Sequence, residues 1–219
     1  MIEVKNLTKA YAGKTVLERL DLELGNSEAA VILGPSGSGK TTLLRLLAGL
    51  DVPDSGEIRM DGELVSRPGY VLEPHKRQIG FVFQTSNLWP HMTVRRNISF
   101  GLGSIRQAEV RGRLNEVLKE ASIEDLAERY PDEISGGEAS RTAIARALAP
   151  NPKYLFLDEP LIHLDPELKL KIMAYILESW KRTRASMIYV THDRDEATEI
   201  PGYTFYLRSG RLERMDSAP

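Results

Sequence analysis

Apolar and polar residues alternate strictly from Leu20 to Leu24, which predicts a strand with one buried face. The uninterrupted apolar run Ala29–Leu33 predicts a strand that is buried on both faces, and a turn rich in glycine and serine follows it. Beyond the turn, four leucines have the spacing that places them on one face of a helix: Leu43, Leu46, Leu47 and Leu50. The first sixty or so residues therefore predict short strands and one buried strand that leads into a helix.

The middle of the chain, from about Gly80 to Pro150, has mainly helical patterns. Ser104 and Gln107 have the spacing of a capping box at a helix start. An apolar stripe follows in five residues: Val110, Leu114, Val117, Leu118 and Ala121. A second helix is predicted to begin near Ser135 and to end before Pro150.

Buried-strand patterns return after this segment, at Tyr154–Leu157, Met187–Val190 and Tyr203–Leu207. Asp165 and Pro166 have the sequence of a helix start between the first two of these strands. Strands and helices thus alternate at both ends of the chain. This alternation predicts an α/β core with a helical insert.

Composition excludes several classes of protein. Of the 219 residues, 42% are hydrophobic and 27% are charged, which is the balance of a folded domain rather than of a disordered chain. The chain has no cysteine, so a disulfide scaffold, a cysteine-rich zinc site and a thiol nucleophile are excluded. The net charge of −2 argues against a polycationic surface for nucleic acid. No apolar run approaches the roughly 18 residues of a membrane-spanning helix, and no N-terminal signal peptide is expected.

The segment Gly34–Thr41 matches the pattern G-x-x-x-x-G-K-[ST] at every fixed position, between a predicted buried strand and a helix. Glycines allow consecutive backbone N–H groups to point into one concavity, and the helix N-terminus adds partial positive charge. Lys40 can reach the β- and γ-phosphates, and the Thr41 hydroxyl can bind Mg²⁺. A chance glycine-rich linker is the alternative, but the flanking strand and helix disfavour it. The loop predicts nucleoside triphosphate binding without separating a kinase, GTPase, helicase or transport ATPase.

Two adjacent carboxylates follow the strand predicted at Tyr154–Leu157. Asp158 stands at the strand end, where folds with such a loop hold Mg²⁺. Glu159 can orient and deprotonate an attacking water, and Pro160 ends the strand. An ordinary acidic turn is the alternative. The phosphate loop makes Asp158 the favoured metal ligand and Glu159 the favoured base.

Three further features follow a fixed order with these motifs: Gln84 in Ile79-Gly-Phe-Val-Phe-Gln84, the segment Ser135-Gly-Gly-Glu138, and His192 after the strand at Met187–Val190. Taken singly, each is compatible with an ordinary loop, surface or strand-end residue. Together, the five motifs closely resemble the nucleotide-binding subunits of ABC transporters over essentially the whole chain, from about Val4 to Arg211. Residues 74–80 and 88–94 resemble bacterial importers, in the branch for polyamine, sugar, ferric-ion or inorganic-anion uptake.

The resemblance implies a role for each matching residue. Nine consecutive residues would hold the nucleotide phosphates: Gly34, Pro35, Ser36, Gly37, Ser38, Gly39, Lys40, Thr41 and Thr42. Tyr11 would stack on the adenine ring. Three residues would hold Mg²⁺: Thr41, Gln84 and Asp158. Four residues would act in catalysis, with the glutamate as base and the histidine on the γ-phosphate: Lys40, Gln84, Glu159 and His192.

A second set of residues is implied to act on nucleotide held by another copy of the chain. This signature consists of Ser135, Gly136, Gly137 and Glu138. A serine and two glycines at a helix start form an anion site of the same physical kind as the phosphate loop, about 100 residues away. If one nucleotide uses both sites, a head-to-tail dimer is the simple arrangement. Asp165 would belong to the loop that signals between the two nucleotide sites.

The fold implied by the resemblance is α/β: a P-loop NTPase core with an N-terminal antiparallel β-subdomain and a helical insert that carries the signature. We predict one domain over residues 1–219, with the core at 1–84 and 151–219 and the insert at about 85–150. The implied activity is hydrolysis of ATP with Mg²⁺ to drive solute import. The implied partners are a second copy, integral membrane permease subunits and an extracytoplasmic solute-binding protein, without nucleic acid. The implied location is cytoplasmic, peripheral on the inner face of the cell membrane.

The sequence departs from the family pattern in places. The signature usually reads Leu-Ser-Gly-Gly-Gln, and Ile134 and Glu138 replace its first and last residues. An ionised Glu138 only accepts hydrogen bonds and would repel a phosphate, so we expect it to point away from the nucleotide. Ile162 and His163 replace the usual serine and its neighbour, which removes a hydroxyl. The chain length leaves no room for the regulatory β-domain of many importers in this branch.

Two other classes of function remain open. An ABC ATPase that acts on DNA or the ribosome would share the motifs, but Gln84 and Ser135 lie only 51 positions apart with no sustained heptads between them. A small-molecule kinase would explain the phosphate loop and leave the signature and His192 without a role. Co-purification with membrane proteins, DNA or ribosomes would separate the first two, and phosphate appearing in water would exclude the kinase.

Overall fold

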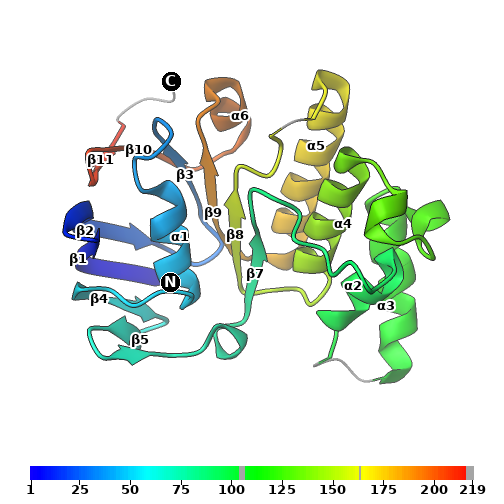
Figure 1. Cartoon of the computed structure of the whole chain (residues 1–219), viewed down its shortest axis with the longest axis horizontal. Coiled ribbons are helices and arrows are strands. Elements are labelled where there is room, and N and C mark those ends of the chain that lie inside the picture. Colours follow the sequence, from blue (N-terminus) through cyan, green and yellow to red (C-terminus); the bar gives the residue numbers. More distant parts are fainter. Residues whose placement is uncertain (104–106, 163, 216–219) are drawn as a thin grey trace.

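Two β-sheets of different kinds organise the chain (Figure 1). One sheet is antiparallel throughout and has the strand order β2-β1-β4-β5-β6. The other has the order β11-β10-β3-β9-β8-β7, in which neighbouring strands are parallel except for β10 and β11. The computed structural model describes residues 1–103, 107–162 and 164–215.

Strands and helices follow the order that the sequence patterns predict. The antiparallel sheet consists of β1 (Ile2–Tyr11), β2 (Lys14–Leu24), β4 (Ser55–Met60), β5 (Glu63–Arg67) and β6 (Tyr70–Val71). The second sheet consists of β3 (Ala29–Leu33), β7 (Ile79–Val82), β8 (Tyr154–Asp158), β9 (Ser186–Thr191), β10 (Tyr203–Arg208) and β11 (Arg211–Arg214). The helices are α1 (Lys40–Ala48), α2 (Val94–Phe100), α3 (Gln107–Glu120), α4 (Gly136–Leu148), α5 (Pro166–Thr183) and α6 (Arg194–Glu199). Short 3₁₀ helices lie at Pro74–Lys76, Glu124–Leu126 and Pro131–Glu133.

Helix α1 lies between the two sheets and begins six residues after β3 ends. Its residues Leu43, Leu46 and Leu47 are fully buried in one apolar cluster with Val4 of β1 and Ile32 of β3. A helix of nine residues is too short to be stable by itself, so this burial stabilises it. The packing therefore fixes where the N-terminus of α1 lies relative to the second sheet.

The guanidinium of Arg77 binds the C-terminal end of α1. It donates to the carbonyl oxygens of Leu47 at 2.8 Å and of Val65, in β5, at 2.7 Å. Burial lowers the pKa of Arg77 to about 10, so the group is still charged near neutral pH. A positive charge at a helix C-terminus is favourable. The sequence patterns give no sign of this contact, because 30 residues separate Arg77 from Leu47.

The opposite face of the second sheet is covered by helices. Alternate residues of β3 face the two sides: Ala30 and Ile32 pack with α1, whereas Val31 and Leu33 join the cluster that contains residues of α2 to α6. Figure 1 shows α2, α3 and α4 gathered on the side remote from β1 and β2. All three helices lie between β7 and β8 in the sequence. The α/β fold with a helical insert is thereby confirmed.

Most predicted elements are present, with one correction. Of the five residues in the predicted stripe along α3, Leu114, Val117, Leu118 and Ala121 are buried and Val110 is partly buried. Helix α1 is shorter than predicted, because Gly49 adopts a left-handed φ of 74° and ends the helix at Ala48. Leu50 therefore leaves the helix face and is 39% exposed. The capping box predicted from Ser104 falls on residues outside those described. Among the described residues, no helix combines the length and the apolar character needed to span a membrane.

Candidate functional site

The turn between β3 and α1 leaves its polar groups available to a ligand. Gly37 and Gly39 have φ values of 79° and 108°, a region that glycine adopts without steric cost. No side chain of the described residues caps the N-terminus of α1, so the first-turn N–H groups are not satisfied in that way. The buried Ser38 Oγ likewise finds no hydrogen-bond partner among the described residues. Open donors at a helix N-terminus are suited to an anion.

Lys40 places a buried cation inside this turn. Its side chain is 5% exposed, and Nζ donates to the carbonyl oxygens of Gly34 at 2.8 Å and Pro35 at 3.2 Å. Nζ also lies 3.4 Å from Glu159 Oε1. The loop thus folds around the ammonium and holds it where a phosphate would lie.

The two strand-end carboxylates occupy different surroundings. Asp158 is the last residue of β8 and faces the Thr41 hydroxyl. Burial raises the pKa of Asp158, and the charge of Glu159 adds to the effect. A cation bound there would favour the ionised form. The oxygens of Asp158 and Thr41 are therefore a donor set that fits a hard divalent ion.

Glu159 connects the phosphate loop to His192. Its backbone has a left-handed φ of 47°, and its N–H donates to the Val190 carbonyl oxygen at 2.9 Å. This conformation turns the side chain so that Oε1 meets Lys40 while Oε2 lies 3.1 Å from His192 Nδ1. One carboxylate therefore contacts both the buried cation and the histidine, as the sequence motifs predict for neighbours in one site.

A cavity of about 200 Å³ brings the predicted residues together. Gln84, which is distant in sequence, joins the phosphate loop in its wall. The complete lining is Val16, Ser36, Gly37, Gly39, Lys40, Thr41, Thr42, Gln84 and Glu159. The side-chain oxygen of Gln84 adds a further hard donor.

Tyr11 lies beside this cavity rather than in its lining. Its side chain is partly exposed, and its hydroxyl donates to the carboxylate of Asp51. The ammonium of Lys9 lies 5.0 Å from the ring centroid, and the ring is close enough to Thr42 for their hydroxyls to interact. The ring is thus held next to the first turn of α1. This placement is compatible with the predicted contact to a nucleobase.

The signature at the start of α4 is separate from this cavity. Ser135 Oγ accepts from the N–H of Glu138 at 3.3 Å, and Glu138 Oε2 accepts from the N–H of Ser135 at 2.7 Å. The carboxylate of Glu138 is thus turned back onto its own helix, where the Ser135 N–H lowers its pKa. None of the signature residues lines the phosphate-loop cavity. A single chain therefore does not bring the two predicted anion sites together.

Asp165 caps helix α5. Its Oδ1 accepts from the N–H of Leu168 at 2.9 Å, which stabilises the helix start. The predicted signalling role of Asp165 stays a prediction. The departure noted at His163 lies outside the described residues, whereas Ile162 is partly buried next to it.

A groove near the loop after Gln84 was not predicted from the sequence. It has a volume of about 600 Å³ and contains two neighbouring aromatic rings, Trp89 and Phe100, with centroids 4.4 Å apart. Phe100 is 61% exposed. The Arg146 guanidinium lies 4.8 Å from the Trp89 ring and donates to the Asn87 carbonyl oxygen at 2.9 Å. These groups come from α2, α4 and the loop between β7 and α2, so no local pattern could have indicated the groove.

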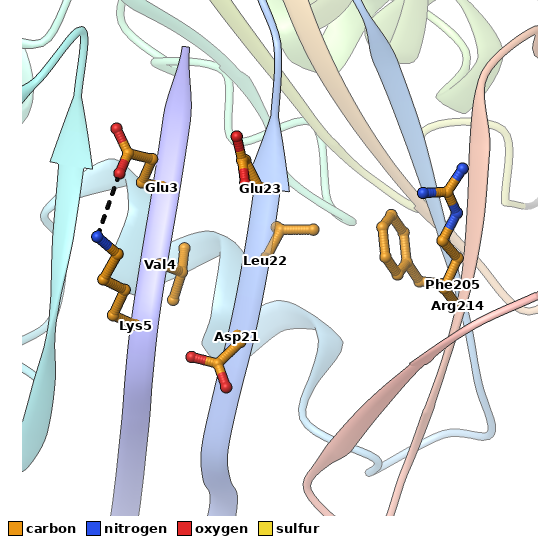
Figure 2. Close-up of a pocket in the computed structure, with 8 residues that line it drawn as sticks. All are labelled: Glu3, Val4, Lys5, Asp21, Leu22, Glu23, Phe205 and Arg214. Atoms are coloured by element: carbon orange, nitrogen blue, oxygen red, sulfur yellow. Dashed lines mark ion pairs between the residues drawn. The ribbon is translucent and has the colours of Figure 1, made fainter.

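Another cavity, of about 350 Å³, lies at β1, β2, β10 and β11 (Figure 2). Figure 2 shows the carboxylates of Glu3, Asp21 and Glu23 around it, with Glu3 paired to Lys5 at 3.5 Å. None of the predicted site residues lines this cavity. Its three carboxylates outnumber the cations of Lys5 and Arg214, which does not favour a triphosphate.

The chain is similar to known proteins over most of its length. Residues 17–162 match the protein family described as ABC transporter. The chain is 41% identical to the sulfate/thiosulfate import ATP-binding protein CysA of Bradyrhizobium diazoefficiens, over 99% of this chain and 63% of the relative. It is 39% identical to the spermidine/putrescine import ATP-binding protein PotA of Pseudomonas aeruginosa, over 99% of this chain and 59% of the relative. The chain thus spans about three fifths of these relatives.

A solved structure shares the whole fold. It is the dimeric ATP-binding cassette MJ0796 in a post-hydrolysis state with ADP and phosphate, with a TM-score of 0.88 and 34% identity. The match covers 100% of this chain and 99% of that one. The fold predicted from the motifs is confirmed by this similarity.

Proposed function

Because the chain belongs to the ABC transporter family, we propose that it hydrolyses ATP to power solute import through separate transmembrane partner subunits. The observation that carries the proposal is the single cavity in which the phosphate loop, Gln84 and Glu159 meet. Glu159 also contacts His192, which brings the predicted base and the predicted γ-phosphate ligand together within one chain.

The phosphate loop would bind the triphosphate and orient it. The open N–H groups at the start of α1 and the ammonium of Lys40 would compensate the phosphate charge. In doing so, Lys40 would exchange its contacts with the Gly34 and Pro35 carbonyls for contacts with phosphate oxygens. The Tyr11 ring would stack on the adenine.

Thr41, Asp158 and Gln84 would hold Mg²⁺, since their oxygens fit a hard cation. When bound, Mg²⁺ would neutralise charge that develops on the phosphate oxygens. The two carboxylates would then have separate tasks, because Asp158 faces Thr41 and Glu159 faces Lys40 and His192.

Glu159 would orient a water molecule and accept its proton as the water oxygen attacks the γ-phosphorus. The bond between that phosphorus and the bridging oxygen breaks, which leaves ADP and inorganic phosphate. His192 would hold the Glu159 carboxylate through its Nδ1 contact and stabilise the γ-phosphate with the rest of its ring.

A second copy would complete the site. Ser135, Gly136 and Gly137 stand at an exposed helix start outside the phosphate-loop cavity, so they would act on nucleotide that another chain holds. The dimeric state of the similar cassette MJ0796 supports this arrangement. Nucleotide would join the two copies, and hydrolysis would release them.

The groove at Trp89 and Phe100 supports a membrane partner. Its exposed aromatic surface adjoins the loop after Gln84, so a permease segment docked there would sense the state of the nucleotide site. The relatives named as import proteins support import, with an extracytoplasmic solute-binding protein in the full system. The chain would then work at the inner face of the membrane.

Substitution Glu159→Gln tests the proposal. The amide cannot accept the proton from water, so we expect ATP turnover to fall by roughly 100-fold while ATP binding persists. Phosphate release and binding of a fluorescent ATP analogue measure the two effects. Glu167→Gln, at an exposed position, is the control and should retain full turnover. Turnover at the wild-type rate in Glu159→Gln would show that Glu159 is not the base.

A further inference from the structure

A charged cluster lies directly behind the loop that carries His192. We propose that Lys169 and Glu196 are positioning residues that hold this loop so that the imidazole meets Glu159. The inference rests on the proposed function, because it concerns the same hydrolytic site. Neither residue lines the phosphate-loop cavity.

Glu196 is the buried centre of the cluster. It is 8% exposed and lies in α6. Its carboxylate accepts from the hydroxyls of Tyr189 at 2.9 Å and Thr191 at 2.8 Å, while Lys169 Nζ lies 3.1 Å from its other oxygen. A buried carboxylate with two hydroxyl donors and one ammonium is fully engaged, so the position of α6 is fixed relative to β9.

The two residues that flank His192 are both held by this cluster. The Thr191 hydroxyl donates to Glu196 and accepts from the N–H of Asp193 at 3.0 Å. The Asp193 carboxylate lies 3.3 Å from Lys169 Nζ. The backbone on either side of His192 therefore cannot move without breaking one of these contacts. The imidazole itself is about half exposed, so packing alone does not fix it.

The charges of the cluster depend on Lys169. Its ammonium is the cation between two carboxylates, and its ion pairs raise its pKa although burial opposes the charge. Lys169 and a backbone N–H likewise hold the pKa of Asp193 low against burial. Without the ammonium, Asp193 and Glu196 would repel each other across the space that Lys169 occupies. The loop would then move, and His192 with it.

Lys169 also links His192 to the predicted signalling loop. Its N–H donates to the Asp165 carbonyl oxygen at 2.9 Å in the first turn of α5. A displacement at Asp165 would therefore reach Lys169 through one helical turn and His192 through the Lys169–Asp193 ion pair. This route joins two site residues that lie 27 positions apart in the sequence.

Substitution Lys169→Met tests the inference in the purified chain. The thioether keeps the length of the side chain and removes its charge. We expect kcat for ATP to fall roughly tenfold with KM nearly unchanged, because the displaced imidazole is needed in the transition state rather than for binding. Lys169→Arg should recover most of the activity. Lys171→Met, on an exposed face of the same helix, should match the wild type.

A double-substitution cycle separates positioning from a general structural role. In a His192→Ala background, Lys169→Met should add no further loss of kcat, because the residue through which it acts is gone. A similar fall in both backgrounds would overturn the inference, and so would an unchanged kcat in the wild-type background. The imidazole NMR signal of His192 should shift in Lys169→Met and not in Lys171→Met, and equal spectra would also overturn it.

The proposed function fails separately from this inference. Absence of ATP turnover in the wild type, or full turnover in Glu159→Gln, would contradict the function. The NMR comparison does not need turnover, so it still decides whether Lys169 positions His192. Glu196→Gln gives a second variant in which the same signal should shift.

Discussion

Helix α1 begins after a turn of glycine and serine residues, and helix α4 begins at a serine followed by two glycines, but only the N-terminus of α4 is capped by a side chain. The cap residue of α1 is Gly39, which offers no side chain, and the buried Lys40 follows it. The cap residue of α4 is Ser135, which forms a reciprocal capping box with Glu138. The first helix start retains its donors, and the second already uses two of its N–H groups internally.

This difference separates the groups that the two helix starts offer within one chain. The α1 site has open donors, the buried cation of Lys40 and the Glu159 carboxylate at one cavity, with Asp158 at the end of β8 next to Thr41. The α4 site has an exposed serine and glycine surface with a carboxylate on its first turn. An anion can bind at α1 without help, whereas at α4 it needs a partner that brings its own cations.

Gly34, before α1, and Gly136, the first residue of α4, differ in what the fold requires of them. A Cβ atom on Gly34 would come within 2.4 Å of the Leu207 carbonyl oxygen, so the fold itself requires glycine there. A Cβ on Gly136 would meet nothing within 4 Å, so the fold places no demand for glycine at position 136. We therefore expect the glycine at position 136 to serve a group that approaches from outside the chain.

The largest effect is expected from Lys40→Ala. Among the described residues that line the phosphate-loop cavity, Lys40 is the cation, and its loss leaves the Glu159 carboxylate without an ammonium partner to repel a triphosphate. We expect ATP turnover to fall by roughly 100-fold or more, with much weaker ATP binding. Titration with a fluorescent ATP analogue measures the binding. Lys14→Ala, at an exposed position, is the control. Wild-type affinity in Lys40→Ala would mean that the backbone donors of α1 suffice, and the contrast with α4 would disappear.

The sequence predicts those parts of the site that depend on adjacent residues. The phosphate loop, the carboxylates Asp158 and Glu159, and the strands that precede them are local patterns, and the structure has them where predicted. The end of α1 can also be predicted, because glycine is the residue expected just past a helix and Gly49 stands there. The spacing of Leu50 favours the helix face, but the left-handed conformation of Gly49 ends the helix before it.

The rest of the site depends on contacts between distant segments. Arg77 reaches the end of α1, and Lys169 reaches Glu196, only after the elements have packed. For Glu138, the charge alone predicts a carboxylate that points away from the nucleotide. The contact that holds this carboxylate, with the N–H of Ser135, comes from the capping geometry of the helix start.

A smaller effect, on association alone, is expected from Gly136→Ala. Alanine at this first helical position should leave stability unchanged or raise it by up to about 1 kcal/mol, since it favours the helix and meets no neighbour. ATP-driven dimerisation should weaken by roughly tenfold, because the methyl group crowds a phosphate held by the second copy. Light scattering with ATP in a Glu159→Gln background measures the dimer.

Gly112→Ala is the matched control for this prediction. Gly112 also lies in a helix, α3, and a Cβ there would meet nothing within 4 Å. It should gain similar stability without any change in dimerisation. Equal dimerisation of the two variants would remove the reason to regard the start of α4 as a nucleotide site.

The smallest effect is expected from Glu138→Gln, which keeps the cap and removes its charge. The Ser135 N–H lowers the pKa of Glu138 from its ordinary value of 4.5, so the carboxylate stabilises the fold above that pH and ceases to do so as pH falls through the lowered pKa. Partial exposure limits this contribution to about 0.5 kcal/mol. The wild-type Tm should therefore fall slightly more than that of the variant between pH 5 and pH 3.

The same variant should also change association. At neutral pH, Glu138→Gln should dimerise with ATP about twofold to fivefold more tightly, because it removes a negative charge from the N-terminus of α4. Glu167→Gln in the first turn of α5 is the control, and if it tightened the dimer equally, the effect would be one of net charge rather than of the site.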